Sequence, residues 1–156
     1  MITRRLTRIT AAAVLAAGLA ACGGKAKRPD APVAEPTMSL YDRLGKRDAI
    51  AAVVKDLVEQ RVASDRRINL FFKTTDLPDL QAKLVDQICE ATGGPCKYTG
   101  RDMRTSHAGL GIKDADLAAL VEDLKTSLDQ FQVGAKEQQE LLAALAAMRD
   151  DIVTAK

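Results

Sequence analysis

The chain has 156 residues, 47% of them hydrophobic, and a formal net charge of +2. This length suits one compact domain with a short appendage, because a domain of roughly 100 to 150 residues can bury an adequate core. The charged residues are spread along the chain and only 3% of residues are aromatic. This composition gives no extended positive field for phosphates and few rings for base stacking, so nucleic acid is not expected as a partner.

The first 21 residues have the pattern of an export signal. Arg4, Arg5 and Arg8 precede an apolar run that ends at Ala21. The run is too short to span a bilayer as a mature helix but has the right length for a signal peptide. We therefore expect residues 1–21 to be removed on export.

Cys22 follows this run directly. The sequence Leu-Ala-Ala-Cys resembles the lipobox of bacterial lipoproteins, in which the thiol receives a diacylglyceryl group before cleavage on its amino side. We expect Cys22 to become a lipidated first residue that anchors the exported protein to a bacterial membrane. Gly23 replaces the Asp that signals retention at the inner membrane, so a two-membrane cell would place the protein on the outer membrane, facing the periplasm. The alternative is an ordinary signal peptide with an incidental cysteine.

Residues 22–38 predict a flexible tether. They contain three of the five prolines of the chain among Ala, Lys and Glu, a composition that cannot bury apolar surface. The folded domain is therefore expected to span residues 39–156.

The folded region has helical periodicity in four places, where apolar residues recur at three- and four-residue spacing. We predict a first helix over about 47–64 and a second long helix that ends at Gly93-Gly94-Pro95. A third begins with Asp114 as its cap and continues to Phe131, and a fourth spans about 135–153. A short apolar segment lies around 68–72, and 96–103 is expected to be an ordered loop. No alternating strand pattern is present, so the fold class is all-α with about four principal helices.

His107 is the only histidine of the chain. A lone histidine is more often a surface or structural residue than a ligand, but several ordered segments around it resemble the group 1 truncated haemoglobins. The segments are Ser39–Gly45, Phe71-Phe72, Ala91–Pro95, Tyr98–Met103, and His107 with Gly109 and Gly111. The resemblance covers about residues 39–153. It implies a two-over-two helical sandwich, with haem held between the two helix pairs and His107 as the iron ligand.

The resemblance also implies roles for other residues. Phe72 matches the Phe that wedges against the haem face, although ordinary core packing would also explain it. Lys83 occupies the position at which relatives often have a residue that pairs with a haem propionate. The alternative is that Lys83 is simply solvated. Tyr98 and Met103 belong to the matching loop and short helix and are counted among the cofactor-binding residues.

The expected gas-binding pocket departs from the family pattern. Relatives that hold dioxygen tightly place a Tyr on the first long helix and a Gln on the second. Here the first position is Val58 or Glu59, because the chain is one residue longer between Val54 and Phe72. On the second helix the distal positions are occupied by Leu80 and Leu84. An apolar pocket is therefore expected. Two alternatives would make the pocket polar. Lys83 would ligate the iron if its amine were deprotonated and turned inward, and Gln81 or Gln87 would face the ligand if the second helix were rotated.

Cys89 and Cys96 are seven residues apart on either side of the Gly-Gly-Pro turn. In an exported protein two thiols brought together by a turn are expected to oxidise to a disulfide, and two buried free thiols are the alternative. The chain has no Cys-x-x-Cys-His motif, which excludes haem attachment of the cytochrome c kind. The expected cofactor is non-covalent haem b.

Three functions are compatible with these features. The first is reversible binding of dioxygen, carbon monoxide or nitric oxide at ferrous haem. The second is redox catalysis, as a nitric oxide dioxygenase or a peroxidase, and the third is electron transfer by a haem lipoprotein; a reductase is a possible partner. An enzyme that activates dioxygen needs a polar distal group, and Val58, Leu80 and Leu84 offer none. Gas binding is therefore the preferred hypothesis.

Overall fold

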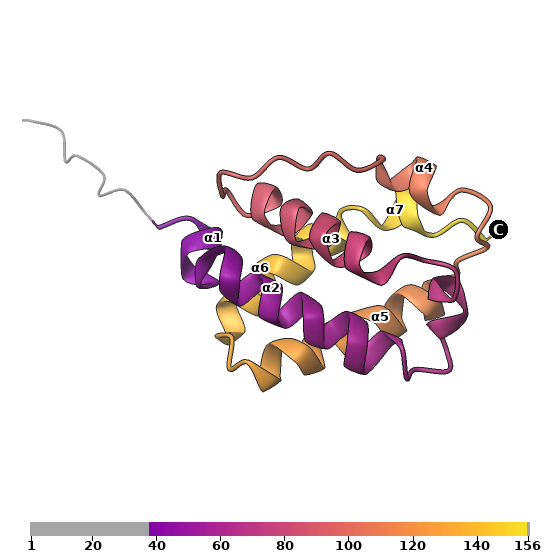
Figure 1. The fold of residues 1–156 in the computed structure, drawn as a ribbon, viewed down its shortest axis with the longest axis horizontal. Helices are drawn as coiled ribbons and strands as arrows, with labels where there is room; N and C mark the ends of the chain where they lie inside the picture. Colours follow the sequence, from indigo (N-terminus) through magenta and orange to yellow (C-terminus); the bar gives the residue numbers. More distant parts are fainter. Residues whose placement is uncertain (1–37, 156) are drawn as a thin grey trace, which may run out of the picture. The chain divides into compact units, whose positions relative to one another are not determined.

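The computed structural model describes residues 38–155, which form helices and no strand (Figure 1). The predicted signal peptide, Cys22 and the predicted tether up to Thr37 lie outside the described residues. The helices are α1 (Leu40–Arg43), α2 (Lys46–Asp56), the π-helix η1 (Leu57–Val62), the 3₁₀ helix η2 (Asn69–Phe72), α3 (Leu77–Ala91), α4 (Met103–His107), α5 (Asp114–Gln130), α6 (Ala135–Ala146) and α7 (Arg149–Ile152). Between residues 38 and 155, no helix has both the length and the apolar character that a membrane span requires.

Two layers of helices make up this domain. Figure 1 shows α2 and α3 side by side, with α5 and α6 crossing behind them. The core between the layers is aliphatic, and its largest buried cluster consists of Val53, Leu57, Val62, Ile68, Ala119, Leu124, Leu128 and Leu141. These residues come from both layers, as burial of one apolar stripe per helix requires. The predicted all-α, two-over-two sandwich is confirmed.

Local sequence signals explain most helix ends. The Asp76 carboxylate caps α3 by accepting from the Asp79 N–H at 3.0 Å. After α3, Gly93 takes a φ of +86°, a left-handed conformation that favours glycine and ends the helix. The cap of α5 was predicted one residue too late: it is Lys113, whose N–H donates to the Asp116 side chain at 2.8 Å.

The fourth predicted helix, 135–153, is in fact two helices. It is interrupted between α6 and α7, where Met148 has φ −93° and ψ 1°. Beyond the break, Ile152 is buried in a cluster with Ile112 and Leu117. The N–H groups of residues 154 and 155 then donate to the Ile112 carbonyl at 2.9 Å. The interruption thus accompanies a turn of the chain end onto the segment that precedes α5, a tertiary contact that helical periodicity does not contain.

A disulfide joins Cys89, near the end of α3, to Cys96, and their Cα atoms are 5.7 Å apart. Cys89 is completely buried. Gly94 packs so closely beside it that an added Cβ would lie 2.6 Å from the Cys89 Sγ and from the Tyr41 ring. The turn between the two cysteines therefore has no room for a side chain at position 94. The bond attaches the start of the 96–102 loop to α3.

Replacing both Cys89 and Cys96 by Ser is expected to lower the free energy of unfolding by roughly 2 to 3 kcal/mol, because the short covalent loop restricts the unfolded chain. Urea denaturation of the double variant, compared with oxidised and reduced wild type, measures this difference. Mass spectrometry of non-reduced peptides identifies the bond itself. Two alkylatable thiols in protein isolated from the periplasm would contradict it.

Candidate functional site

His107 lies at the end of the short helix α4. The Asp102 carboxylate caps this helix by accepting from the Thr105 N–H at 2.9 Å and the Thr105 hydroxyl at 2.7 Å. These hydrogen bonds, the backbone one first, lower the pKa of Asp102 below its ordinary value. The imidazole is half-buried, and its Nδ1 lies 2.7 Å from the Met103 carbonyl oxygen. A proton on Nδ1 donated to this carbonyl leaves the lone pair on Nε2, the arrangement of a metal-binding histidine.

The loop that carries α4 is attached to α3 by polar contacts as well as by the disulfide. The Glu90 carboxylate accepts from the Tyr98 N–H and from the Lys97 ammonium, both at 3.0 Å. These contacts, the backbone one first, lower the pKa of Glu90. The Tyr98 hydroxyl donates to the Arg101 carbonyl at 2.8 Å. Tyr98 was predicted to bind the cofactor, and the structure places its hydroxyl on the backbone of its own loop.

Gln87 and two methionines form the contact between α3, α4 and α7. The Gln87 Nε2 lies 3.3 Å from the Met103 Sδ and 3.6 Å from the Met148 Sδ. Thioether sulfur is a weak acceptor, and unbranched Met side chains rearrange easily. This contact, which we call the Gln–Met seam, is therefore held by flexible side chains. Sequence reasoning placed Met103 near the cofactor but did not anticipate Met148.

Leu80 and Leu84 lie on the same face of α3 as Gln87, at the i, i+4 and i+7 positions. Both leucines are half-buried. They pack against the buried cluster of α2, η1 and α3 that includes Val54, Val58 and Val85. The predicted distal residues are thus brought together with Val58.

A cavity of about 270 Å³ lies between η1, η2 and the start of α3. We call it the η1–α3 cavity. It is lined by the apolar residues Val58, Val62, Ala63, Phe72 and Leu77 and by the polar residues Asn69, Lys73 and Thr75. Phe72 and Val58, two of the residues assigned to the pocket from sequence, both line it. The sequence analysis did not assign the three polar residues to the site. Their position on either side of Phe72 in the chain was the signal that would have indicated them.

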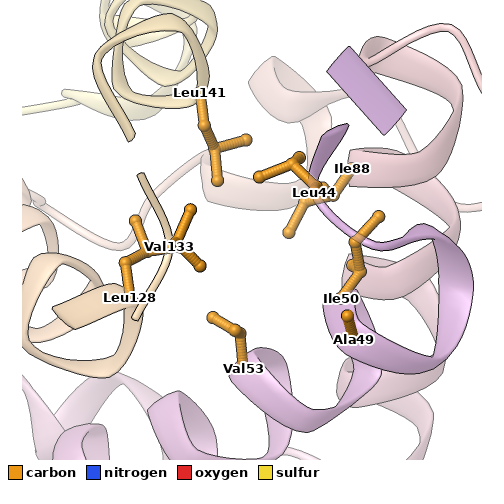
Figure 2. A pocket seen from close by; sticks show the side chains of 8 residues that line it. All are labelled: Leu44, Ala49, Ile50, Val53, Ile88, Leu128, Val133 and Leu141. Atoms are coloured by element: carbon orange, nitrogen blue, oxygen red, sulfur yellow. The ribbon is translucent and has the colours of Figure 1, made fainter. Parts of the chain in front are cut away.

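A second cavity lies among α2, α3, α5 and α6 (Figure 2). Its volume is about 10 Å³, and only apolar side chains line it, among them Ile50, Val53 and Val133. A volume of this size is about that of one water-sized probe. This cavity therefore cannot hold a porphyrin.

The π-helix η1 decides which side chain faces the η1–α3 cavity. A π-helix hydrogen-bonds i to i+5 and so takes up one residue more than an α-helical turn, which agrees with the extra residue expected between Val54 and Phe72 from the resemblance. Val58 is 2% exposed and lines the cavity, whereas Glu59 is exposed. The Glu59 carboxylate accepts from the Gln81 amide at 3.1 Å, at the surface. The inward position on the first long helix is therefore Val58.

Lys83 lies on α3 with 42% of its side chain exposed and forms an ion pair with Asp79. The structure thus places the ammonium at the surface with a carboxylate of its own helix. Such exposed i,i+4 pairs contribute little to stability.

The donor set fits iron held by a macrocycle. Among residues 38–155, no three His, Cys, Asp or Glu side chains are grouped to hold a bare metal ion. His107 instead offers a single nitrogen with its other ring nitrogen already hydrogen-bonded. An iron porphyrin needs one such axial ligand and an apolar space for its ring, and the η1–α3 cavity supplies apolar walls. The donor and the apolar walls are each of the kind that haem requires, although His107 is not among the residues that line the cavity.

Relatives of known family are similar to this chain in sequence, and solved structures are similar to it in fold. A relative from Mycolicibacterium paratuberculosis, a group 1 truncated haemoglobin, is 34% identical over 78% of this chain and 88% of its own length. One from Synechocystis is 33% identical over 70% of this chain and 88% of its own. The solved structure of a truncated haemoglobin from Tetrahymena pyriformis superposes with a TM-score of 0.71 at 27% identity, covering 74% of this chain and 98% of that one.

The family model that matches is described as the bacterial-like globin, and it covers residues 39–154. This range coincides closely with the domain expected from sequence. It includes α4, η1, η2 and the 96–102 loop, so every residue of the site described above lies within it. The chain belongs to the bacterial-like globin family, and its relatives are group 1 truncated haemoglobins.

Proposed function

We propose that the chain binds haem b non-covalently, with the Nε2 of His107 as the iron ligand, and that it reversibly binds a diatomic gas. When bound, ferrous haem supplies the metal that takes up dioxygen, carbon monoxide or nitric oxide. The observation that carries the proposal is the 2.7 Å contact between the His107 Nδ1 and the Met103 carbonyl. It fixes the ring orientation and leaves Nε2 available as a donor.

The side chains on the opposite side of the site support gas binding over catalysis. Val58, Leu80 and Leu84 can exclude water but cannot donate a hydrogen bond. Chemistry that builds charge on dioxygen requires a donor or cation there. Such a pocket favours capture and release of an uncharged gas, and the nitric oxide dioxygenase and peroxidase alternatives are less well supported.

We also propose that the protein is exported and held at a bacterial membrane through a lipid on Cys22. The support is the residue pattern before Cys22, together with the Cys89–Cys96 disulfide, since structural disulfides persist in oxidising compartments. A haem globin tethered in this way would meet gases at the membrane surface, and a reductase in the same compartment would keep its iron ferrous.

His107→Ala is expected to lose most of its haem, or to hold it in a form that added imidazole restores, because the chain contains no other imidazole. The absorption spectra of the reduced and oxidised protein measure this. Ser106→Ala on the same helix is the matched control and is expected to keep the wild-type Soret band. An unchanged five-coordinate ferrous spectrum in His107→Ala would show that His107 is not the ligand.

The dioxygen off-rate is expected to be roughly ten- to more than a hundredfold faster than in relatives with a distal Tyr. A hydrogen bond from a donor to a charge-bearing ligand is worth about 1.5 to 3 kcal/mol, and the distal side chains Val58, Leu80 and Leu84 offer no such donor. Carbon monoxide binding, which needs no donor, is expected to change little. Stopped-flow displacement of dioxygen measures the rate.

The register of η1 provides a matched pair of variants for this prediction. Val58→Tyr is expected to slow dioxygen release, because position 58 faces the η1–α3 cavity. Glu59→Tyr is expected to leave the rate unchanged, because position 59 is at the surface. The opposite ranking of the two variants would mean that the distal face has been assigned one residue out of register.

Wild-type protein is expected to sediment with membranes and to incorporate a palmitate analogue, because Cys22 would carry the lipid. Cys22→Ser is expected to accumulate as an unlabelled precursor or to appear in the soluble fraction. Cys89→Ser with Cys96→Ser retains Cys22 and serves as the control. Absence of label from the wild type would refute the anchor.

A further inference from the structure

Lys73 stands at the polar edge of the η1–α3 cavity. It follows Phe72 directly, and both residues line the cavity, as do Asn69 and Thr75. Lys73 is exposed, so its ammonium is solvated. No ion pair within 4.0 Å links it to any residue between 38 and 155, whereas Lys83 pairs with Asp79. Of these two lysines, Lys73 is the one whose charge has no carboxylate partner within the described domain.

The distribution of polarity in the cavity matches that of haem. The haem ring is apolar, but one edge carries two carboxylates that must stay near water or a cation, because burying an unpaired charge is costly. The apolar lining comes from η1, Phe72 and Leu77, and the polar lining comes from the 69–75 segment. A haem placed with its ring against Phe72 and its carboxylate edge toward the 69–75 segment would have apolar side chains around the ring and polar side chains beside the carboxylates.

Two lysines could serve the carboxylates, and the contacts distinguish them. For Lys83 to reach a haem carboxylate, its ammonium must first leave Asp79, which replaces one ion pair by another. For Lys73 no ion pair between residues 38 and 155 is broken. The free-energy difference favours Lys73, even though both pairs would be partly exposed and screened by salt.

We infer that Lys73, rather than Lys83, pairs with a carboxylate of the bound haem and slows its loss; this rests on the proposed haem function. The pairing assigns the 69–75 segment to the mouth of the haem site. It also replaces the assignment made from resemblance, in which Lys83 held that role.

The test compares Lys73→Gln, Lys83→Gln and Lys55→Gln in the full chain. Lys55 is exposed on α2 and does not line the cavity, so its variant controls for the loss of one positive charge. Each protein is loaded with iron protoporphyrin IX or with its dimethyl ester, in which the carboxylates are masked. The rate of haem transfer to excess apomyoglobin is then measured at low and high salt.

Lys73→Gln is expected to lose iron protoporphyrin IX roughly two- to fivefold faster than wild type at low salt, the range of an exposed ion pair, with a smaller difference at high salt. With the dimethyl ester, wild type and Lys73→Gln are expected to lose the ligand at equal rates. Lys83→Gln and Lys55→Gln are expected to match wild type with both ligands.

Equal haem loss from Lys73→Gln and wild type would overturn the inference, as would a faster loss that persists with the dimethyl ester. An effect confined to Lys83→Gln would restore the assignment from resemblance. In each of these cases the wild-type Soret band shows that the proposed haem function still holds. A wild-type protein that gives no Soret band with iron protoporphyrin IX would overturn the function and the inference together.

Discussion

The attachment of the 96–102 loop to α3 is the constraint on which the site depends. Helix α4 has five residues, none of them fully buried, so its own packing gives it little stability. Its position follows from the loop before it, which is held by the Cys89–Cys96 bond and by the Glu90 carboxylate, and from the Arg104–Asp151 ion pair that joins it to α7. Because His107 lies at the end of α4, the imidazole is positioned by α3 through this chain of contacts.

Sequence reasoning was most successful where one short-range signal dominates. Helical periodicity predicted α2, α3, α5 and α6, because each must bury a single apolar stripe. The fold and family followed from ordered motifs around His107. The break between α6 and α7 and the Gln–Met seam were not predicted, since both depend on contacts between residues far apart in the chain. Lys83 is a different case, because its ion pair with Asp79 is local to α3, whereas its assignment to a haem carboxylate came from resemblance to relatives.

A buried polar group accompanies the irregular turn of η1. Asp56, only 8% exposed, ends α2 and accepts from the Ser127 hydroxyl at 2.7 Å and from the Arg61 Nε at 3.1 Å. Burying a carboxylate is costly unless it is paired and hydrogen-bonded, and here it is both. Ser127 belongs to α5 and Arg61 to η1 itself, so the network connects the wide turn to the opposite layer. Such a turn is less regular than an α-helix, and this network fixes it in place.

The π-turn also shows how a pocket can change its chemistry through chain length. A residue inserted into a regular helix rotates everything that follows by about 100° and would turn the core face toward water. A π-helical turn accommodates the additional residue locally, so the chain before and after it keeps its orientation. Val53 before the turn and Ile68 after it are both buried. An insertion absorbed in this way would change which side chain lines the η1–α3 cavity and would leave the buried residues before and after it in place.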